Sequence, residues 1–159
     1  MNYCGLNKYD TSNGPGIRVS LFVSGCRMHC KGCFNPESWN FNYGKKFEND
    51  DTGRYVVSLL SNPYIEGFSL LGGDPFEPEH EKELLNLLIN IKTFSNKSIW
   101  AWTGRKYDQI KDSPLLKYID ILIDGAFIEH LKNPKLKYRG SSNQRILQLH
   151  PFKDITNEY

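Results

Sequence analysis

The segment IRVSLFVSGCRMHCKGC, residues 17–33, decides the fold. Its first part, Ile17–Val23, is apolar and β-branched, and it follows the turn-forming residues Asn13–Gly16, so it predicts a buried strand. Its second part holds three of the four cysteines of the chain within eight residues. A strand that leads directly into a cysteine-rich loop predicts a site at the carboxyl end of that strand.

Downstream of this segment, short apolar runs alternate with helical patterns. Further strands are predicted at 65–71, 98–102, 118–123 and 145–149, and helices at 54–60, 79–95 and 106–111. Strands that are joined by helices favour an α/β fold with a parallel sheet and right-handed crossovers. The length of 159 residues is that of one ordinary domain, so we expect a single domain over residues 1–159.

Small and polar residues stand where the predicted strands end. Gly72-Gly73-Asp74, Thr103-Gly104 and Asp124-Gly125 each follow a strand. Because ligands bind at the carboxyl ends of parallel strands, we expect these residues to share one site with the cysteine loop. The paired glycines also suit a tight turn, and an Asp before Gly is most often a turn former, so these alternatives stay open on the residues alone.

The spacing Cys26-x3-Cys30-x2-Cys33 indicates a metal centre, because soft thiolates select zinc or iron–sulfur clusters. Both centres normally take four protein ligands. The site is therefore either a zinc site completed by His29 or His80, or a cluster that has one iron open to another ligand. Disulfide redox chemistry is a weaker alternative. The histidines are otherwise expected to be ordinary surface or loop residues; they are His29, His80, His130 and His150.

The composition argues against several other classes. Hydrophobic residues make up 39% and charged residues 24%, and no apolar run approaches the roughly 20 residues that cross a bilayer. Residues 1–10 lack the apolar core of a signal peptide, so we expect a cytoplasmic protein with no membrane partner. A secreted disulfide scaffold would spread its cysteines and use more of them, whereas three of the four here are clustered. Cys4 stands apart and is interpreted as a buried or incidental thiol rather than a ligand. The basic residues at 131–139 are interpreted as a solvated loop face rather than a nucleic-acid site.

The cysteine triplet after a first strand resembles the signature of the radical S-adenosylmethionine superfamily. The resemblance implies a small incomplete TIM-like (β/α) barrel of about five mainly parallel strands. It also implies a 4Fe-4S cluster on Cys26, Cys30 and Cys33, whose open iron is chelated by the methionine part of S-adenosylmethionine. One electron from the cluster then cleaves this cofactor to methionine and a 5′-deoxyadenosyl radical. Gly32 departs from the aromatic residue that often precedes the third cysteine, which points to a subgroup.

Six segments, in family order from about residue 13 to 147, resemble the activating proteins of anaerobic ribonucleotide reductases. They are NGPGIR (13–18), CKGCFNP (30–36), LGGDP (71–75), WTG (102–104), DILIDGAF (120–127) and RGSSNQR (139–145). The resemblance implies an activating enzyme that abstracts a hydrogen atom from a glycine of the reductase large subunit and so forms a glycyl radical. It also implies an electron donor such as reduced flavodoxin. No acid–base step is required, so no catalytic side chain is expected.

Within this resemblance, the strand-end residues bind the cofactor. Gly72 and Gly73 would let backbone carbonyls approach its ammonium group, and Asp74 would add a carboxylate. Thr103 and Asp124 are the next candidates, and Asp124 would contact ribose or carboxylate. The segment 139–145 is either a structural loop or a contact for the cofactor or the partner.

Two rival functions remain. A zinc-binding interaction module would be colourless and free of iron. A radical enzyme that acts on a small molecule, such as a 7-deazaguanine-forming enzyme, would share the cluster but not the protein substrate.

Overall fold

The computed structural model describes residues 1–159 and joins all strands in one eight-stranded sheet, in the order β3-β1-β2-β4-β5-β6-β7-β8. The strands are β1 (Asn2–Asp10), β2 (Arg18–Ser24), β3 (Lys45–Lys46), β4 (Gly67–Gly72), β5 (Ser98–Trp102), β6 (Ile121–Asp124), β7 (Arg145–Leu149) and β8 (Phe152–Asp154). The α-helices are α1 (Arg54–Leu59), α2 (Glu81–Phe94) and α3 (Tyr107–Ile110). Single turns of tighter or wider helix cover Pro36–Trp39, Asn49–Gly53, Pro78–His80, Pro114–Tyr118, Glu129–Leu131 and Thr156–Glu158.

The centre of the sheet is parallel. β2 pairs with β4, β4 with β5, and β5 with β6, all in parallel register. β1 is antiparallel to β2 on one side, and β7 and β8 continue the sheet in antiparallel register on the other. The carboxyl ends of four strands therefore meet along one edge of the sheet.

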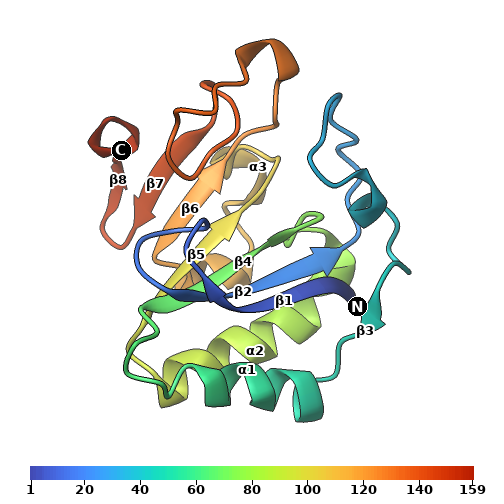
Figure 1. Ribbon diagram of the computed structural model, residues 1–159, viewed down its shortest axis with the longest axis vertical. Coiled ribbons are helices and arrows are strands. Elements are labelled where there is room, and N and C mark those ends of the chain that lie inside the picture. Colours follow the sequence, from blue (N-terminus) through green and yellow to red (C-terminus); the bar gives the residue numbers. More distant parts are fainter.

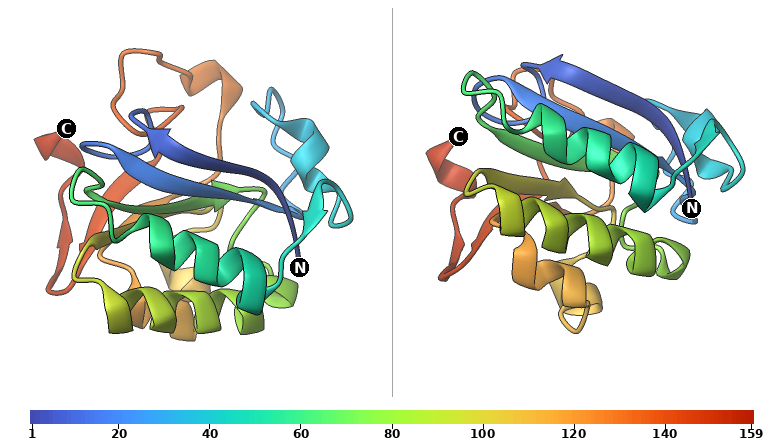
Figure 2. Two further views of the ribbon diagram at one scale, coloured as in Figure 1. Left: turned by 60° about the horizontal axis from the view of Figure 1, so that its bottom comes forward. Right: turned by 90° about the horizontal axis from the view of Figure 1, so that it is seen from below.

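The helices cover one face of the sheet (Figures 1 and 2). Alternate residues of β2 point into this layer, because successive side chains of a strand face opposite sides. Val19, Leu21 and Val23 are fully buried there, in the same core cluster as Leu84 and Leu88 of α2. This core fixes the strands whose ends carry the candidate site.

The other face of the sheet holds a buried arginine. The Arg18 guanidinium donates to Ser69 Oγ at 2.7 Å and to Ser98 Oγ at 3.1 Å, and it lies 5.6 Å from the ring centroid of Trp100. Burial lowers the pKa of Arg18 to about 10. Because these partners belong to β4 and β5, Arg18 joins three parallel strands near their amino ends.

The predicted elements are present, and two strands match to the residue, at 98–102 and 145–149. The strand predicted from residue 118 begins at Ile121, because Pro114–Tyr118 form a helical turn. β1, β3 and β8 were not predicted. The mixed α/β class is confirmed, but the sheet has eight strands rather than about five, and its linear strand order does not confirm the incomplete TIM-like barrel. β7 is antiparallel because residues 125–144 contain no helix long enough for a parallel crossover. None of the helices has the length and apolarity that a membrane crossing requires.

Candidate metal centre

The loop after β2 carries Cys26, Cys30 and Cys33 as free thiols. Cys26 is buried, with 8% of its surface exposed, whereas the other two are half-buried. The Cys33 N–H donates to the Cys30 carbonyl at 3.1 Å, and Gly32 turns the chain between them with a φ of 74°. The structure thus brings the three cysteines onto one loop, but it does not gather their sulfurs into a group of metal ligands.

The donor set nevertheless fits an iron–sulfur cluster, because three soft thiols share a short loop and His80, one of the two alternative ligands, has both ring nitrogens engaged elsewhere. His29 stacks on Trp39 with ring centroids 4.5 Å apart. The His80 ring nitrogens each lie 2.9 Å from a backbone carbonyl, that of Ser24 or of Asp74. The expectation that His80 is a surface or loop histidine is wrong: it is fully buried between two strand ends.

The surroundings of Cys26 favour the protonated thiol when no metal is bound. Burial raises the pKa of Cys26 to about 11, and the negative charges of Asp74 and Glu77 act in the same direction. Metal binding displaces a thiol proton, so a cluster would stabilise the thiolate here.

Asp74 and Thr103, which the sequence placed at two strand ends, are brought together. Both Asp74 carboxylate oxygens accept from Thr103 Oγ1 at 3.0 Å. The same carboxylate accepts from the Gly104 N–H at 3.1 Å and forms an ion pair with Arg105 Nη1 at 2.8 Å. Burial raises the pKa of Asp74, although these partners act against the rise. The two side chains therefore link the ends of β4 and β5, and their contact with a cofactor stays a prediction.

Glu77 is a functional candidate that the sequence reasoning missed. Its carboxylate is 1% exposed, accepts from the Arg27 N–H at 2.8 Å and from Arg27 Nη1 at 2.7 Å, and forms an ion pair with Arg105 Nη2 at 3.0 Å. Burial opposes ionisation, but these hydrogen bonds outweigh it and hold the pKa of Glu77 below its usual range. The spacing of Asp74 and Glu77 was visible, but nothing in the sequence marked their arginine partners.

Gly72 and Gly73 lie where the end of β4 packs tightly against the backbone at the end of β2. A Cβ at Gly73 would stand 2.4 Å from the Gly25 carbonyl oxygen, and one at Gly72 would stand 2.5 Å from Val23 N. The φ of Gly72 is 113°, in the region that favours glycine. Backbone packing thus accounts for both glycines, and their approach to a cofactor stays a prediction.

Asp124 ends β6 and is 1% exposed. It accepts from the Tyr107 N–H at 2.8 Å and forms an ion pair with Arg145 of β7. This side chain therefore joins the ends of β6 and β7 to the start of α3.

The segment 139–145 folds back onto the turn after β6. Gln144 Nε2 donates to the Gly125 carbonyl at 3.0 Å, and Asn143 Nδ2 donates to the Ala126 carbonyl at 2.7 Å. Arg139 Nη1 donates to the Gln144 carbonyl at 2.9 Å. These contacts favour the interpretation of the segment as a structural loop.

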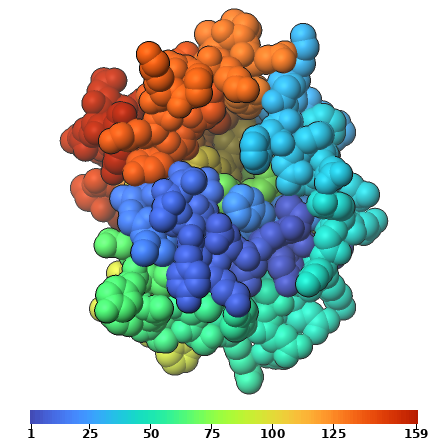
Figure 3. Space-filling model, viewed as in Figure 1, coloured from blue at the N-terminus to red at the C-terminus, as the bar shows by residue number.

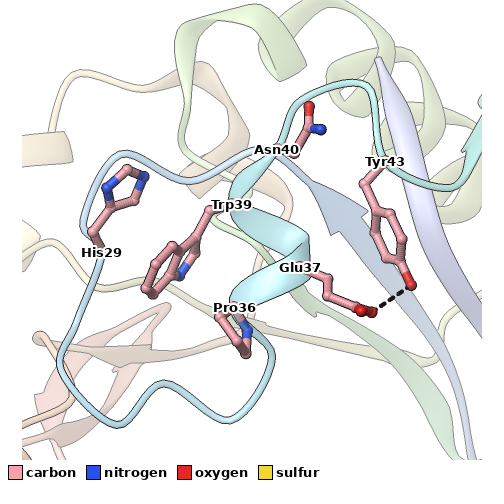
Figure 4. Close-up of a pocket in the computed structure, with 6 residues that line it drawn as sticks. All are labelled: His29, Pro36, Glu37, Trp39, Asn40 and Tyr43. Carbon is pink, nitrogen blue, oxygen red and sulfur yellow. Dashed lines mark hydrogen bonds between the residues drawn. The ribbon is translucent and has the colours of Figure 1, made fainter.

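The surface around the cysteine loop is hollowed. A hollow of about 580 Å³ lies outside the loop, where Tyr43 Oη donates to Glu37 at 2.7 Å (Figure 4). Its lining residues are His29, Pro36, Glu37, Trp39, Asn40 and Tyr43. Figure 3 shows a second depression, between the loop after β2 and the segment after β6. Lys31 and Glu129 form an ion pair at 3.4 Å between these two segments.

Known proteins are similar to this chain over nearly its whole length. A family model described as a 4Fe-4S single cluster domain matches residues 12–147. A protein of Enterobacteria phage T4 is 45% identical over 147 residues, which are 92% of this chain and 93% of the relative. A protein of Haemophilus influenzae is 42% identical over 158 residues (96% and 99%), and one of Escherichia coli is 39% identical over 154 residues (94% and 99%). All three are named anaerobic ribonucleoside-triphosphate reductase-activating protein.

Proposed function

The chain belongs to the family of anaerobic ribonucleoside-triphosphate reductase-activating proteins, and we propose that it is the enzyme that forms the glycyl radical of such a reductase. It carries a 4Fe-4S single cluster domain. One observation carries the proposal: within the matched residues, three free thiols share one loop at the carboxyl edge of four parallel strands. That is the edge at which α/β proteins bind their ligands.

In this proposal, Cys26, Cys30 and Cys33 hold the cluster and leave one iron open for S-adenosylmethionine. When bound and reduced, the cluster would supply the electron for cleavage of this cofactor, which is the chemistry needed to remove a hydrogen atom from a glycine of the reductase. The protein holds both groups, orients them and excludes water. The proposed cofactor contacts lie along the same edge, at Gly72, Gly73, Asp74, Thr103 and Asp124.

We interpret the sheet as the incomplete (β/α) barrel of a radical S-adenosylmethionine enzyme and the chain as one domain. Its linear strand order leaves the sheet unclosed, which suits a protein substrate whose loop must reach the strand ends. The proposed partners are the reductase large subunit and a donor such as reduced flavodoxin, and the proposed location is the cytoplasm.

The test is anaerobic reconstitution with iron and sulfide, followed by reductant and S-adenosylmethionine. We expect a brown protein that releases 5′-deoxyadenosine and, with purified reductase, gives the electron paramagnetic resonance signal of a glycyl radical. A colourless protein that binds zinc would refute the proposal. Release of 5′-deoxyadenosine without a glycyl radical on the reductase would point to the small-molecule radical enzyme instead.

A further inference from the structure

A short segment after β4 holds the backbone on both sides of the first cysteine. Residues 73–80 contact every residue of 23–27 except Cys26 itself. The Gly73 N–H donates to the Val23 carbonyl at 2.7 Å, the Asp74 N–H donates to the Gly25 carbonyl at 2.8 Å, the Arg27 N–H donates to Glu77 Oε1 at 2.8 Å, and a His80 ring nitrogen lies 2.9 Å from the Ser24 carbonyl.

The opposite side of the same backbone is also held. The Gly25 N–H donates to the Ser38 carbonyl at 2.7 Å, and the Cys26 N–H donates to the Trp39 carbonyl at 3.2 Å. Cys26 is therefore fixed from two sides, whereas Cys30 and Cys33 lie on a more exposed part of the loop. Of the three proposed cluster ligands, Cys26 is the one that the protein itself orients.

Glu77 is the side chain in this arrangement that accepts a hydrogen bond from the backbone of Arg27, the residue directly after Cys26. It binds both the backbone and the guanidinium of Arg27, and it is almost completely buried. Glu79 offers a natural comparison, because it also pairs with Arg27 but has 47% of its side chain exposed and touches no backbone of the cysteine loop.

We propose that Glu77 is a positioning residue for the cluster: it fixes the Cys26–Arg27 peptide and places a buried negative charge beside the first ligand. The inference rests on the proposed function, because it requires a cluster on this loop. Partners that orient the ligands of a metal are typically worth about 10–100-fold in metal affinity. Net charge near a cluster is also one of the factors that set its reduction potential.

The experiment compares Glu77→Ala and Glu77→Gln with Glu79→Ala and Glu79→Gln in the reconstituted protein. The measurements are the rate of cluster loss to an iron chelator, the midpoint potential of the cluster, and the thermal midpoint of each metal-free protein. We expect Glu77→Ala to lose its cluster about 10–100-fold faster than wild type, whereas Glu79→Ala loses it at the wild-type rate.

Glu77→Gln separates the hydrogen bond from the charge. Its amide oxygen can still accept from the Arg27 N–H, so we expect most of the cluster retention to be restored. The lost negative charge makes addition of an electron easier, so we expect the midpoint potential to rise above that of Glu79→Gln. A merely structural role would leave the potential unchanged.

The outcomes separate this inference from the function on which it rests. A wild-type protein that takes up no iron overturns the proposed function, and the inference falls with it. A wild-type protein that holds a cluster, together with a folded Glu77→Ala variant that retains it equally well, overturns the inference alone. If Glu77→Ala does not fold, the inference is tested by the midpoint potential of the cluster in Glu77→Gln. A midpoint potential equal to that of Glu79→Gln would then overturn the inference.

Discussion

Replacement of Gly73 by alanine tests whether the close approach of β4 to β2 builds the site. The new Cβ would stand 2.4 Å from the carbonyl oxygen of Gly25, 2.8 Å from its carbonyl carbon and 2.9 Å from its nitrogen. All three atoms are backbone, so no side chain can rotate away. The backbone at Gly73 must therefore move away from the backbone at Gly25. This movement would weaken the nearby Gly73–Val23 and Asp74–Gly25 hydrogen bonds.

The expected cost follows from these contacts. An overpacked site costs about 1–3 kcal/mol, and each weakened hydrogen bond adds about 1 kcal/mol. The lower entropy of the unfolded alanine chain returns about 0.4–1 kcal/mol. We expect Gly73→Ala to lower the free energy of unfolding by about 2–5 kcal/mol, which for a chain of this size is a fall of roughly 4–20 °C in the thermal midpoint.

Gly104→Ala is the matched control, because Gly104 also follows a strand end. Its Cβ would meet the Met28 Cγ at 3.0 Å, and Met28 is a flexible side chain with 36% of its surface exposed. We expect a change below about 1 kcal/mol. The assay is urea unfolding of the metal-free proteins under reducing conditions, followed by iron analysis after reconstitution. Equal stability of the two variants would refute the reasoning about the backbone contact.

Three further predictions concern the thiols and the buried carboxylates. Cys33→Ala should lose the cluster absorbance after anaerobic reconstitution, whereas Cys4→Ala should keep it; loss in Cys4→Ala would show that the ligand set is wrong. Because the folded-state pKa of Glu77 is lowered, its charge stabilises the fold above its unfolded pKa of about 4.3, and this stabilisation is lost as the pH falls through the lower folded pKa. The difference in unfolding free energy between wild type and Glu77→Gln should therefore be constant from about pH 7 to pH 6 and should shrink below about pH 4, and a difference that grows in acid would contradict the assignment. Asp124→Ala removes the acceptor of the Tyr107 N–H and the partner of Arg145, so unfolding in urea should show a loss of about 1–3 kcal/mol, and wild-type stability would disprove the role as a link.

The strands at the centre of the sheet could be predicted because buried strands have short apolar sequences with polar or turn-forming residues at both ends. Ser98–Trp102 is bounded by a polar residue before it and by Thr103-Gly104 after it, and it was predicted to the residue. β1 was missed because its pairing with β2 shifts register between Tyr3 and Gly5 and again between Asn7 and Asp10. Such irregularities break the alternation of apolar and polar residues by which a strand is recognised.

In the candidate site, residues in local sequence motifs could be predicted, whereas residues whose partners are distant in the sequence could not. The cysteines, Gly72-Gly73 and Asp74 could be identified because each stands in a local motif at a strand end. Glu77 could not, because its partners Arg27 and Arg105 are 50 and 28 residues away, and only the fold brings them together. His80 was misjudged for a related reason: a histidine just before a helix resembles an exposed residue until the strand ends close around it.

The satisfied polar groups at the strand ends bear on how a cluster would be bound. Asp74, Thr103 and Asp124 already have protein partners, so their order does not depend on a ligand. Cys26 is likewise held by its neighbours, and the part of the site still to be gathered is the loop that carries Cys30 and Cys33. Ordering of flexible protein segments costs conformational entropy and so reduces the binding free energy of a metal centre. Because the strand ends are already ordered, this cost is confined to the one short loop that carries Cys30 and Cys33. Neither Gly73 nor Glu77 is a proposed cluster ligand. We nevertheless expect substitution of either residue to lower the affinity for iron, because both help to keep the backbone around Cys26 rigid.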